Sequence, residues 1–547
     1  MVERSEMSRS RSLFAAHALV LLFLALCVAF PLLCVAFSVR PGDFVRVFSN
    51  GALCGTMANT ALECICSTSI SVVVGYVFAY AVVKTRIPLS NFFAAVPVIH
   101  LVTPPFVGGL SFILLVGRRG FITSTLLGLD VSLYGFPGLL ISQVLCFFPI
   151  SYLICADTLR SMNPNLEQAA RAMGASRFRV FMTVTLPLSA QGMAGAFLFI
   201  AVSVLSDFGN PMIVAGRFKV LAVEIYTQLT GWLNAGTSAV LGLVLVVPSV
   251  ALFCLQNSIM KKNRMNFATI GGKAQFLPSK ESSPITRVVL SLFCALVSLA
   301  VLMQFAAIVF GAFQKLWGIR TEFTLEHMKA VARFSAEMRN SVAFAFFGAL
   351  LATSVSCVAA FLVGRSGVRF SRAIDVLCQI PAAVPGSLFG LAFSLAAASI
   401  KFRSSAALIV IAIAVGFMPF SYRMMSAVFA QIKMSLDDGA AMLGAGRIRV
   451  LFTVLLPVSA GGLFHSFLYD FVRGVGTMSA VIFLVSFSTP LASVKILNLA
   501  EEGFWGDAAA LALVLTAITF AVIGLGNAAL SAAGFRKSAA SRAGVRL

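Results

Sequence analysis

Long apolar runs recur along this chain, and they restrict its fold more than any other feature. A helix needs about 20 apolar residues to cross a hydrocarbon core of about 30 Å. The chain of 547 residues is 59% hydrophobic and 11% charged, whereas about a quarter of a typical soluble domain is charged. The sequence therefore predicts an all-α, polytopic membrane protein with about twelve transmembrane helices. The expected spans are 13–38, 57–83, 91–116, 137–158, 184–206, 237–259, 286–312, 341–363, 372–397, 406–429, 456–486 and 508–532.

A polar, glycine-centred segment occurs twice. Residues 167–190 and 437–460 are identical at 12 of 24 positions. The stretch "TPPFVGGL" at 103–110 likewise corresponds to "VPGSLFGL" at 384–391. Each copy holds an even number of expected spans, so the two copies run parallel through the membrane. We expect a first half over 1–262, a cytoplasmic linker over 263–284 and a second half over 285–547, with the repeated loops at 163–187 and 433–457.

The distribution of cations predicts the topology. With the N-terminus inside, the inner segments hold 25 Lys and Arg residues and the outer segments hold 14. An excess of cations on the inner side is the usual pattern in membrane proteins. Both termini and both repeated loops are therefore expected in the cytoplasm. The net charge of +21 then reflects topology and attraction to membrane lipid, and no nucleic-acid partner is expected.

Each repeated loop has the pattern of a short amphipathic helix followed by a glycine, a basic patch and a new span. A glycine directly after a helix commonly adopts a positive φ and ends the helix. A helix–turn–helix of this kind protrudes from the membrane and is suited to enter a groove on a cytoplasmic partner. Two copies matched in glycine, arginine and proline positions argue against an ordinary solvated loop.

The two loops resemble the EAA coupling loop of ABC-importer permeases with the MetI-like fold. The matching residues are "EQAARAMGA" at 167–175 and "DDGAAMLGA" at 437–445. The resemblance implies that each loop sits in a cleft of one of two ABC ATP-binding subunits, and that a substrate-binding protein delivers cargo outside. In the second copy Asp437 replaces Glu and Gly439 replaces Ala, so weaker docking is expected there. The implied coupling residues are Glu167, Ala169, Ala170, Gly174, Arg177, Arg179, Asp437, Asp438, Ala440, Gly444, Arg447 and Arg449.

Further stretches resemble a narrower group, the fused two-domain permeases of ferric-iron importers in the bacterial inner membrane. Thiamine, 2-aminoethylphosphonate and polyamine permeases have similar frames and remain alternative cargo assignments. The outer segment 321–339 is amphipathic and is a candidate contact for the delivery protein. The ferric-type stretches are "YGFPG" at 134–138, "SDFGNP" at 206–211, "FKVLAVEIYTQLTG" at 218–231 and "GTMSAVIFLVS" at 476–486.

Ionisable residues within or next to the spans are candidates for the translocation pathway, because charges in a membrane are costly and usually functional or paired. Asp470 and Arg473 are three residues apart and share a helix face. They are expected either to form an ion pair that fixes packing or to line the pathway. Glu63 is expected either to line the pathway or to be satisfied by an Asn or Ser on a neighbouring helix. Asp207 is expected either to line the outer vestibule or to cap the loop after its span. No metal site is predicted, because the 11 cysteines are scattered and the four histidines are isolated.

Several protein classes are disfavoured by absent motifs. The sequence has no GxxxxGK[ST] phosphate-binding loop and no HExxH or GxSxG. The chain is therefore expected to be a transport subunit rather than an enzyme, with no cofactor of its own and with ATP and Mg²⁺ on the partner. The alternative from another class is a secondary transporter driven by an ion gradient, with Glu63 and Asp470 as coupling acids. The duplicated loop has no role in that alternative.

Overall fold

The protein is almost entirely helical. The structure, a computed structural model, describes residues 2–103, 106–128, 133–268, 283–365 and 371–532. The expected linker at 263–284 lies largely outside the described residues, as does the end of the chain after residue 532. Within the described parts, the only strands form one short antiparallel hairpin in the second half of the chain.

The described residues between 2 and 268 form thirteen α-helices and four short π-helical turns. The helices are α1 Val2–Leu24, α2 Phe30–Ser38, α3 Pro41–Ser49, α4 Gly51–Lys84, α5 Ser90–Val102, α6 Phe106–Val116, α7 Phe136–Ser161, α8 Pro164–Ala172, α9 Arg177–Val180, α10 Leu186–Leu205, α11 Gly209–Val214, α12 Leu221–Tyr226 and α13 Ala235–Ala268. The π-helical turns are η1 Ala25–Ala29, η2 Phe121–Leu126, η3 Phe181–Thr185 and η4 Thr227–Gly231.

The second half repeats this order, with the hairpin inserted after its first span. Its helices are α14 Pro284–Phe313, α15 Glu326–Ala330, α16 Ser335–Arg365, α17 Ser371–Ala383, α18 Gly386–Ser399, α19 Ser405–Gln431, α20 Ser435–Met442, α21 Arg447–Val450, α22 Leu456–Val475, α23 Ala492–Glu501 and α24 Trp505–Ala532. The strands are β1 Gln314–Leu316 and β2 Arg320–Phe323, and the short turns are η5 Val331–Phe334, η6 Leu451–Leu455 and η7 Val481–Phe483.

Ten helical stretches among the described residues are long and apolar enough to cross a membrane, and an eleventh span is formed if α17 and α18 are counted as one bent pair. This confirms a polytopic helical membrane protein but corrects the individual spans. The expected span 372–397 is bent by 113° between α17 and α18. The expected span 456–486 ends at Val475, and residues beyond it form turns and a short 3₁₀ helix.

Proline explains why two expected spans are broken. The residue before a proline disfavours the helical conformation because the proline ring clashes with it. Val384 precedes Pro385, which has φ −58° and ψ 142° and separates α17 from α18. The expected span 91–116 is likewise divided, because α5 ends before Thr103, which is extended with ψ 139° and precedes Pro104. Hydropathy alone did not reveal these breaks.

The two halves are built around equivalent helix triplets. In the first half α4, α7 and α10 pack against one another, and in the second half α16, α19 and α22 do the same. Close approach is permitted by glycines at these seams. A Cβ at Gly75 would overlap the side chain of Ser151, and one at Gly348 would overlap Ile413.

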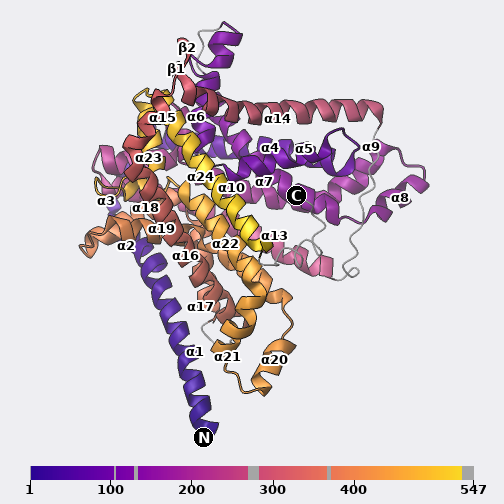
Figure 1. The fold of residues 1–547 in the computed structure, drawn as a ribbon, viewed down its shortest axis with the longest axis vertical. Helices are drawn as coiled ribbons and strands as arrows, with labels where there is room; N and C mark the ends of the chain where they lie inside the picture. The colour runs from indigo at the N-terminus through magenta and orange to yellow at the C-terminus, as the bar shows by residue number, and fades with distance from the viewer. Residues whose placement is uncertain (1, 104–105, 129–132, 269–282, 366–370, 533–547) are drawn as a thin grey trace.

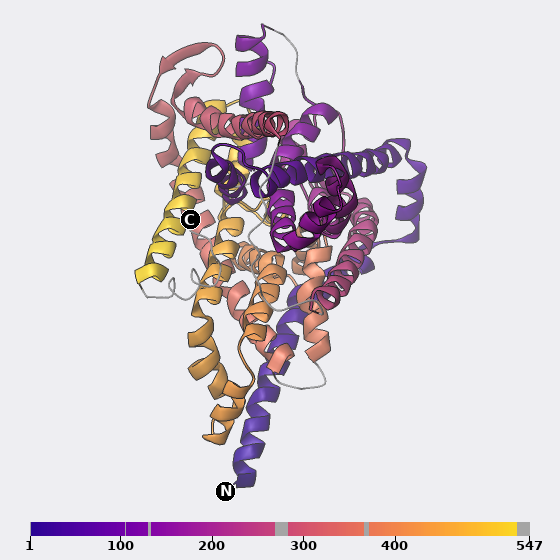
Figure 2. The same cartoon turned by 90° about the vertical axis from the view of Figure 1, so that its right-hand side faces the viewer.

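The first span of each half packs on the opposite half. The N-terminal arm, α1 to α2, contacts α16, α17 and α18 of the second half, while α14 contacts α4, α5 and α6 of the first half. Figure 1 shows α14 alongside α4 and α5, and Figure 2 shows the arms from the side. We call these two segments, α1–α2 and α14, the exchanged arms, because each packs on the opposite half and so holds the two halves together.

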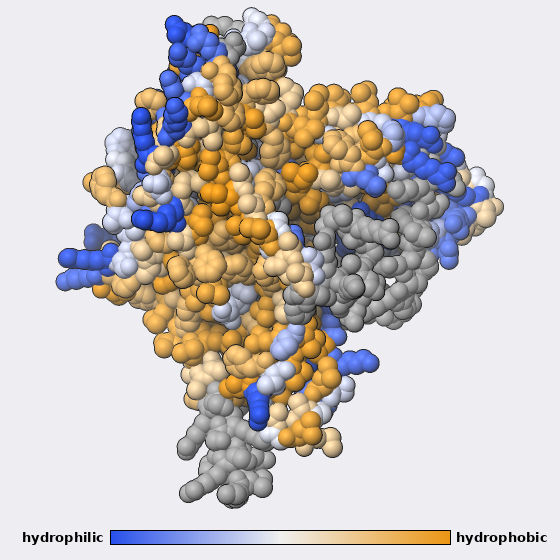
Figure 3. All heavy atoms as spheres, viewed as in Figure 1, coloured by the Kyte–Doolittle hydropathy of each residue, from blue (hydrophilic) through white to orange (hydrophobic). Residues whose placement is uncertain are grey.

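The surface has the composition expected of a protein embedded in lipid. Apolar residues cover most of the face seen in Figure 3, and hydrophilic residues gather at its projecting ends. One side of α14 illustrates the pattern, since Val288, Leu292 and Leu299 are all exposed. In a soluble protein such an extended apolar surface would be unfavourable.

Candidate functional site

The first repeated loop folds as a short helix that ends at a glycine. α8 begins after Asn163, whose side chain accepts a hydrogen bond from the Asn165 amide at 3.0 Å. It ends at Gly174, which has φ +84°. The Gly174 amide donates to the Arg171 carbonyl and the Ala175 amide donates to the Ala170 carbonyl. This pair of bonds is the Schellman arrangement, which satisfies carbonyls at the end of a helix.

The second loop reproduces this geometry. Gly444 also has φ +84°. Its amide donates to the Ala441 carbonyl, and the Ala445 amide donates to the Ala440 carbonyl. The positive φ predicted for both glycines is therefore confirmed. In Figure 1, α8 and α20 each project at the edge of the molecule.

Glu167 of the first loop is buried and paired within the chain. Its Oε1 lies 2.9 Å from Lys84 Nζ, and the two side chains are 9% and 4% exposed. The same oxygen accepts a hydrogen bond of 2.9 Å from Thr185 Oγ1. Lys84 is the last residue of α4, and Thr185 directly precedes α10. α8 is thus fastened to the ends of two spans.

Asp437 of the second loop has the corresponding partner. Its Oδ2 lies 2.5 Å from Arg365 Nη1, and Arg365 is the last residue of α16. The other guanidinium nitrogen donates to the carbonyls of Phe429 and Ile432 at the end of α19, both at 2.6 Å. The sequence pattern did not single out Lys84 and Arg365, although each ends a span at the same place in the repeat.

The remaining coupling candidates lie mostly on the outside of the two loops. Ala170 is buried and Ala440 is half-buried, so these small residues let the helices lie close to the spans. The candidates with exposed side chains are Ala169, Arg177, Arg179, Asp438, Arg447 and Arg449.

Exposed apolar side chains also recur on the two loops, and sequence analysis did not single them out. Leu166 and Leu436 occupy the same repeat position and are 49% and 48% exposed. Met173 and Leu443 form a second pair, 83% and 91% exposed. Large apolar residues at matched exposed positions indicate a surface that a protein partner covers.

A polar cluster lies between the spans of the first half. Gln143 Nε2 donates to Glu63 Oε1 at 2.7 Å and to Asp207 Oδ2 at 3.0 Å. Ser67 Oγ donates to the side-chain amide oxygen of Gln143, Oε1, at 2.8 Å. Asn210 Nδ2 donates to Asp207 Oδ2 at 2.9 Å. The structure therefore brings together two predicted pathway acids, Glu63 and Asp207, through an amide that the sequence did not single out.

The predicted ion pair between Asp470 and Arg473 is not formed. Asp470 is fully buried and accepts hydrogen bonds from Ser421 at 2.6 Å and from Thr353 at 3.2 Å. Arg473 is half-buried. Residues three apart on a helix differ by about 60° in direction, and the side chain of Asp470 is directed to Thr353 of α16 and Ser421 of α19.

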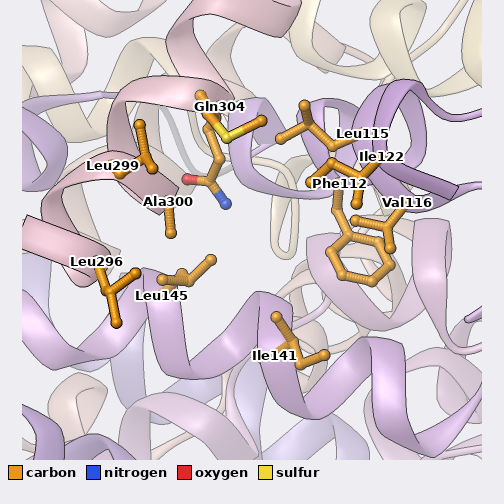
Figure 4. Close-up of a pocket in the computed structure, with 11 residues that line it drawn as sticks. Phe112, Leu115, Val116, Ile122, Ile141, Leu145, Leu296, Leu299, Ala300 and Gln304 are labelled. Atoms are coloured by element: carbon orange, nitrogen blue, oxygen red, sulfur yellow. The ribbon is translucent and has the colours of Figure 1, made fainter. Parts of the chain in front are cut away.

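The cavity in Figure 4 lies where α14 meets the first half. It has a volume of about 220 Å³, and its only polar lining side chain is Gln304. Such a lining is unsuited to an ionic cargo, which requires polar ligands. Among the described residues, no group of three His, Cys, Asp or Glu side chains converges to hold a metal ion. The other lining residues are Phe112, Leu115, Val116, Ile122, Ile141, Leu145, Leu296, Leu299, Ala300 and Met303.

The fold and the duplicated loops define an integral membrane transport component built from two repeats. The family model of the binding-protein-dependent transport system inner membrane component matches the chain twice, over residues 71–265 and 356–537. These segments make up more than half of the chain, and the chain belongs to this family.

Two curated relatives match most of the chain. The ferric transport system permease protein FbpB of Actinobacillus pleuropneumoniae is 28% identical over 507 residues, which cover 88% of this chain and 72% of the relative. A putative ferric transport system permease protein FbpB of Haemophilus influenzae is 29% identical over 432 residues, covering 75% and 67%. The molybdenum permease ModB of Escherichia coli K12 is 32% identical over 163 residues, covering 28% of this chain and 70% of the relative.

Proposed function

We propose that this chain is the permease subunit of an ATP-driven importer, and that α8 and α20 each dock in one of two identical ATP-binding subunits. The observation that carries the proposal is the duplicated loop, with the same backbone conformation at Gly174 and Gly444 and matched exposed apolar residues. ATP and Mg²⁺ are bound by the partner, whose closure moves the coupling helices and changes the side to which the spans open. A secondary transporter has no use for two such docking helices.

The proposed cargo is ferric iron. Two relatives that match most of the chain are named as ferric permeases, which supports iron over thiamine, 2-aminoethylphosphonate or a polyamine. Ferric iron is a hard cation and prefers oxygen ligands. The cluster of Glu63, Asp207 and Gln143 supplies such oxygens, but it is held by internal hydrogen bonds, which suits passage of the cargo rather than tight binding.

The proposed orientation places the coupling loops and both termini in the cytoplasm. The hairpin and α15 then face the outside, where an external binding protein docks. His327 of α15 lies 2.7 Å from Asp507 at the start of α24. This contact fastens the outer segment to the second half and offers the binding protein a fixed surface.

The test is co-expression with the ATP-binding subunit, followed by purification of the complex and by uptake of radioactive ferric iron, presented outside on the binding protein, into vesicles loaded with ATP. We expect the ATP-binding subunit to co-purify and uptake to require ATP. Uptake by the purified chain alone, driven by an ion gradient, would contradict the proposal. Inhibition of this uptake by excess thiamine or a polyamine, but not by excess unlabelled ferric iron, would contradict the cargo assignment.

A further inference from the structure

The acidic residue of each coupling helix is occupied within the chain rather than presented to a partner. We propose that the pairs Lys84–Glu167 and Arg365–Asp437 are matched struts that transmit movement of the coupling helices to α4 and α16. Lys84 and Arg365 are positioning residues in this proposal, which rests on the proposed function. It goes beyond that function because it assigns the path by which docking reaches the spans.

The recurrence of the pair in both repeats is the first argument. Lys84 and Arg365 end equivalent spans, and Glu167 and Asp437 open equivalent loops. The residue types differ, but their lengths compensate. Glutamate is one methylene longer than aspartate and pairs with lysine, whereas the shorter aspartate pairs with the longer arginine. The gaps are 2.9 Å and 2.5 Å, so a direct contact is present in both copies.

Burial is the second argument. An exposed ion pair contributes little to stability, but removal of one partner from a buried pair leaves an uncompensated charge and is costly. In the first pair both side chains are buried, with Lys84 4% and Glu167 9% exposed. In the second pair Arg365 is 5% exposed and Asp437 is 23% exposed, so that pair is partly buried. Each pair therefore behaves as a stiff joint. The exposed residues, Leu166 and Met173 among them, remain available to the ATP-binding subunit.

The third argument is the helix to which each strut is attached. Lys84 ends α4, and Glu63 lies on the same helix about 30 Å away. Arg365 ends α16, which also carries Thr353, a hydrogen-bond partner of Asp470. Both struts thus end on the helices that hold the polar clusters between the spans. A displacement of either coupling helix is delivered to those clusters through a continuous helix.

The two struts are not identical, and the difference sharpens the test. Glu167 is also bound by Thr185, but the equivalent position in the second half is Leu455. Arg365 also holds the carbonyls of Phe429 and Ile432. A lysine at position 365 would have a single nitrogen and would not reproduce all three contacts.

The experiment exchanges the residue types of the two struts in the full complex. Glu167→Asp alone should open a gap and lower iron uptake per ATP hydrolysed by about tenfold, since a charge-assisted hydrogen bond is lost. The double variant Lys84→Arg with Glu167→Asp should restore the ratio to within about twofold. Asp437→Glu with Arg365→Lys should restore it only in part. Glu502→Asp and Arg403→Lys, at exposed positions outside both repeated loops, are the controls.

Retention of the ATP-binding subunit and the thermal midpoint of the purified complex are measured beside the transport ratio. Retention of the ATP-binding subunit should stay near the wild-type value in Glu167→Asp, because the docking surface is unchanged, whereas the thermal midpoint should fall, because a buried ion pair is weakened. If retention of the ATP-binding subunit and iron uptake fell equally, the carboxylate would bind the partner directly, and the proposal would be wrong. Failure of Lys84→Arg to rescue Glu167→Asp would also overturn it. Failure of the wild-type chain to retain the partner would instead remove the proposed function.

Discussion

Gly174 and Gly444 have the same φ of +84°, although they lie in different halves of the chain. Neither glycine has a neighbouring atom within 4 Å of the position that a Cβ would occupy. Space is therefore not the reason for glycine at either site. Glycine is required at both positions because the backbone is left-handed, a conformation that costs an L-residue about 1–2 kcal/mol.

The first prediction follows from this conformation. Gly174→Ala combined with Gly444→Ala should distort the ends of both coupling helices and reduce co-purification of the ATP-binding subunit. Gly439→Ala is the matched control, since it adds the same methyl group within α20, where φ is not positive and space is open. Alanine is also a better helix former than glycine, so this control should bind at least as well as wild type. Equal binding by the double variant and by the control would contradict the docking role of the loops.

The second prediction concerns the exposed apolar residues on the loops. Met173→Asp with Leu443→Asp should abolish capture of the ATP-binding subunit, because a charge would be buried unpaired at the interface. The thermal midpoint of the permease alone should not change, since both side chains are more than 80% exposed. Phe487→Asp provides the comparison, because Phe487 is fully exposed and distant in sequence from both loops. Capture that survives the double substitution would place the interface elsewhere.

The third prediction concerns Gln143. Replacing it with Leu should leave the carboxylates of Glu63 and Asp207 without their shared donor and destabilise the protein by about 2–5 kcal/mol. Both the thermal midpoint in detergent and iron uptake should fall. The control is Gln228→Leu, because Gln228 also donates to a glutamate, Glu224, at 2.8 Å but is less buried. A Gln143→Leu variant as stable and active as this control would exclude the cluster from both roles.

Local patterns carried much of the architecture and of the candidate site. Apolar run length predicted membrane helices, and the repeated glycines predicted their own backbone conformation, because both properties depend on residues close in sequence. The broken spans were also signalled locally, at Thr103 and Val384 before prolines, but average hydropathy conceals a bend.

Contacts between distant segments were not predictable in the same way. Lys84 and Glu167 are 83 residues apart, and nothing in either local pattern names the other. The spacing of Asp470 and Arg473 predicted a shared helix face and a possible ion pair, and that pair is not formed. It did not reveal that hydroxyl groups of two other helices, Ser421 and Thr353, already bind Asp470. The helical period determines the direction in which a side chain points, whereas the packing of other helices determines which group it contacts.

The last prediction tests the exchanged arms and the proposed division of the chain. Residues 1–262 and 285–547, expressed as two separate chains, should assemble without the linker. α1 and α2 pack on the second half, and α14 packs on the first, so each half supplies a helix that the other needs to cover its apolar surface. An affinity tag on one half should recover both in detergent. Gly311→Val in α14 should weaken this recovery, because a Cβ there would lie 3.0 Å from Leu114 and 3.2 Å from Ala509, and overpacking costs about 1–3 kcal/mol. Gly524→Val, at a glycine of α24 with no atom within 4 Å, should not. Recovery of the tagged half alone, from membranes that contain both, would show that the linker rather than the arms holds the halves together.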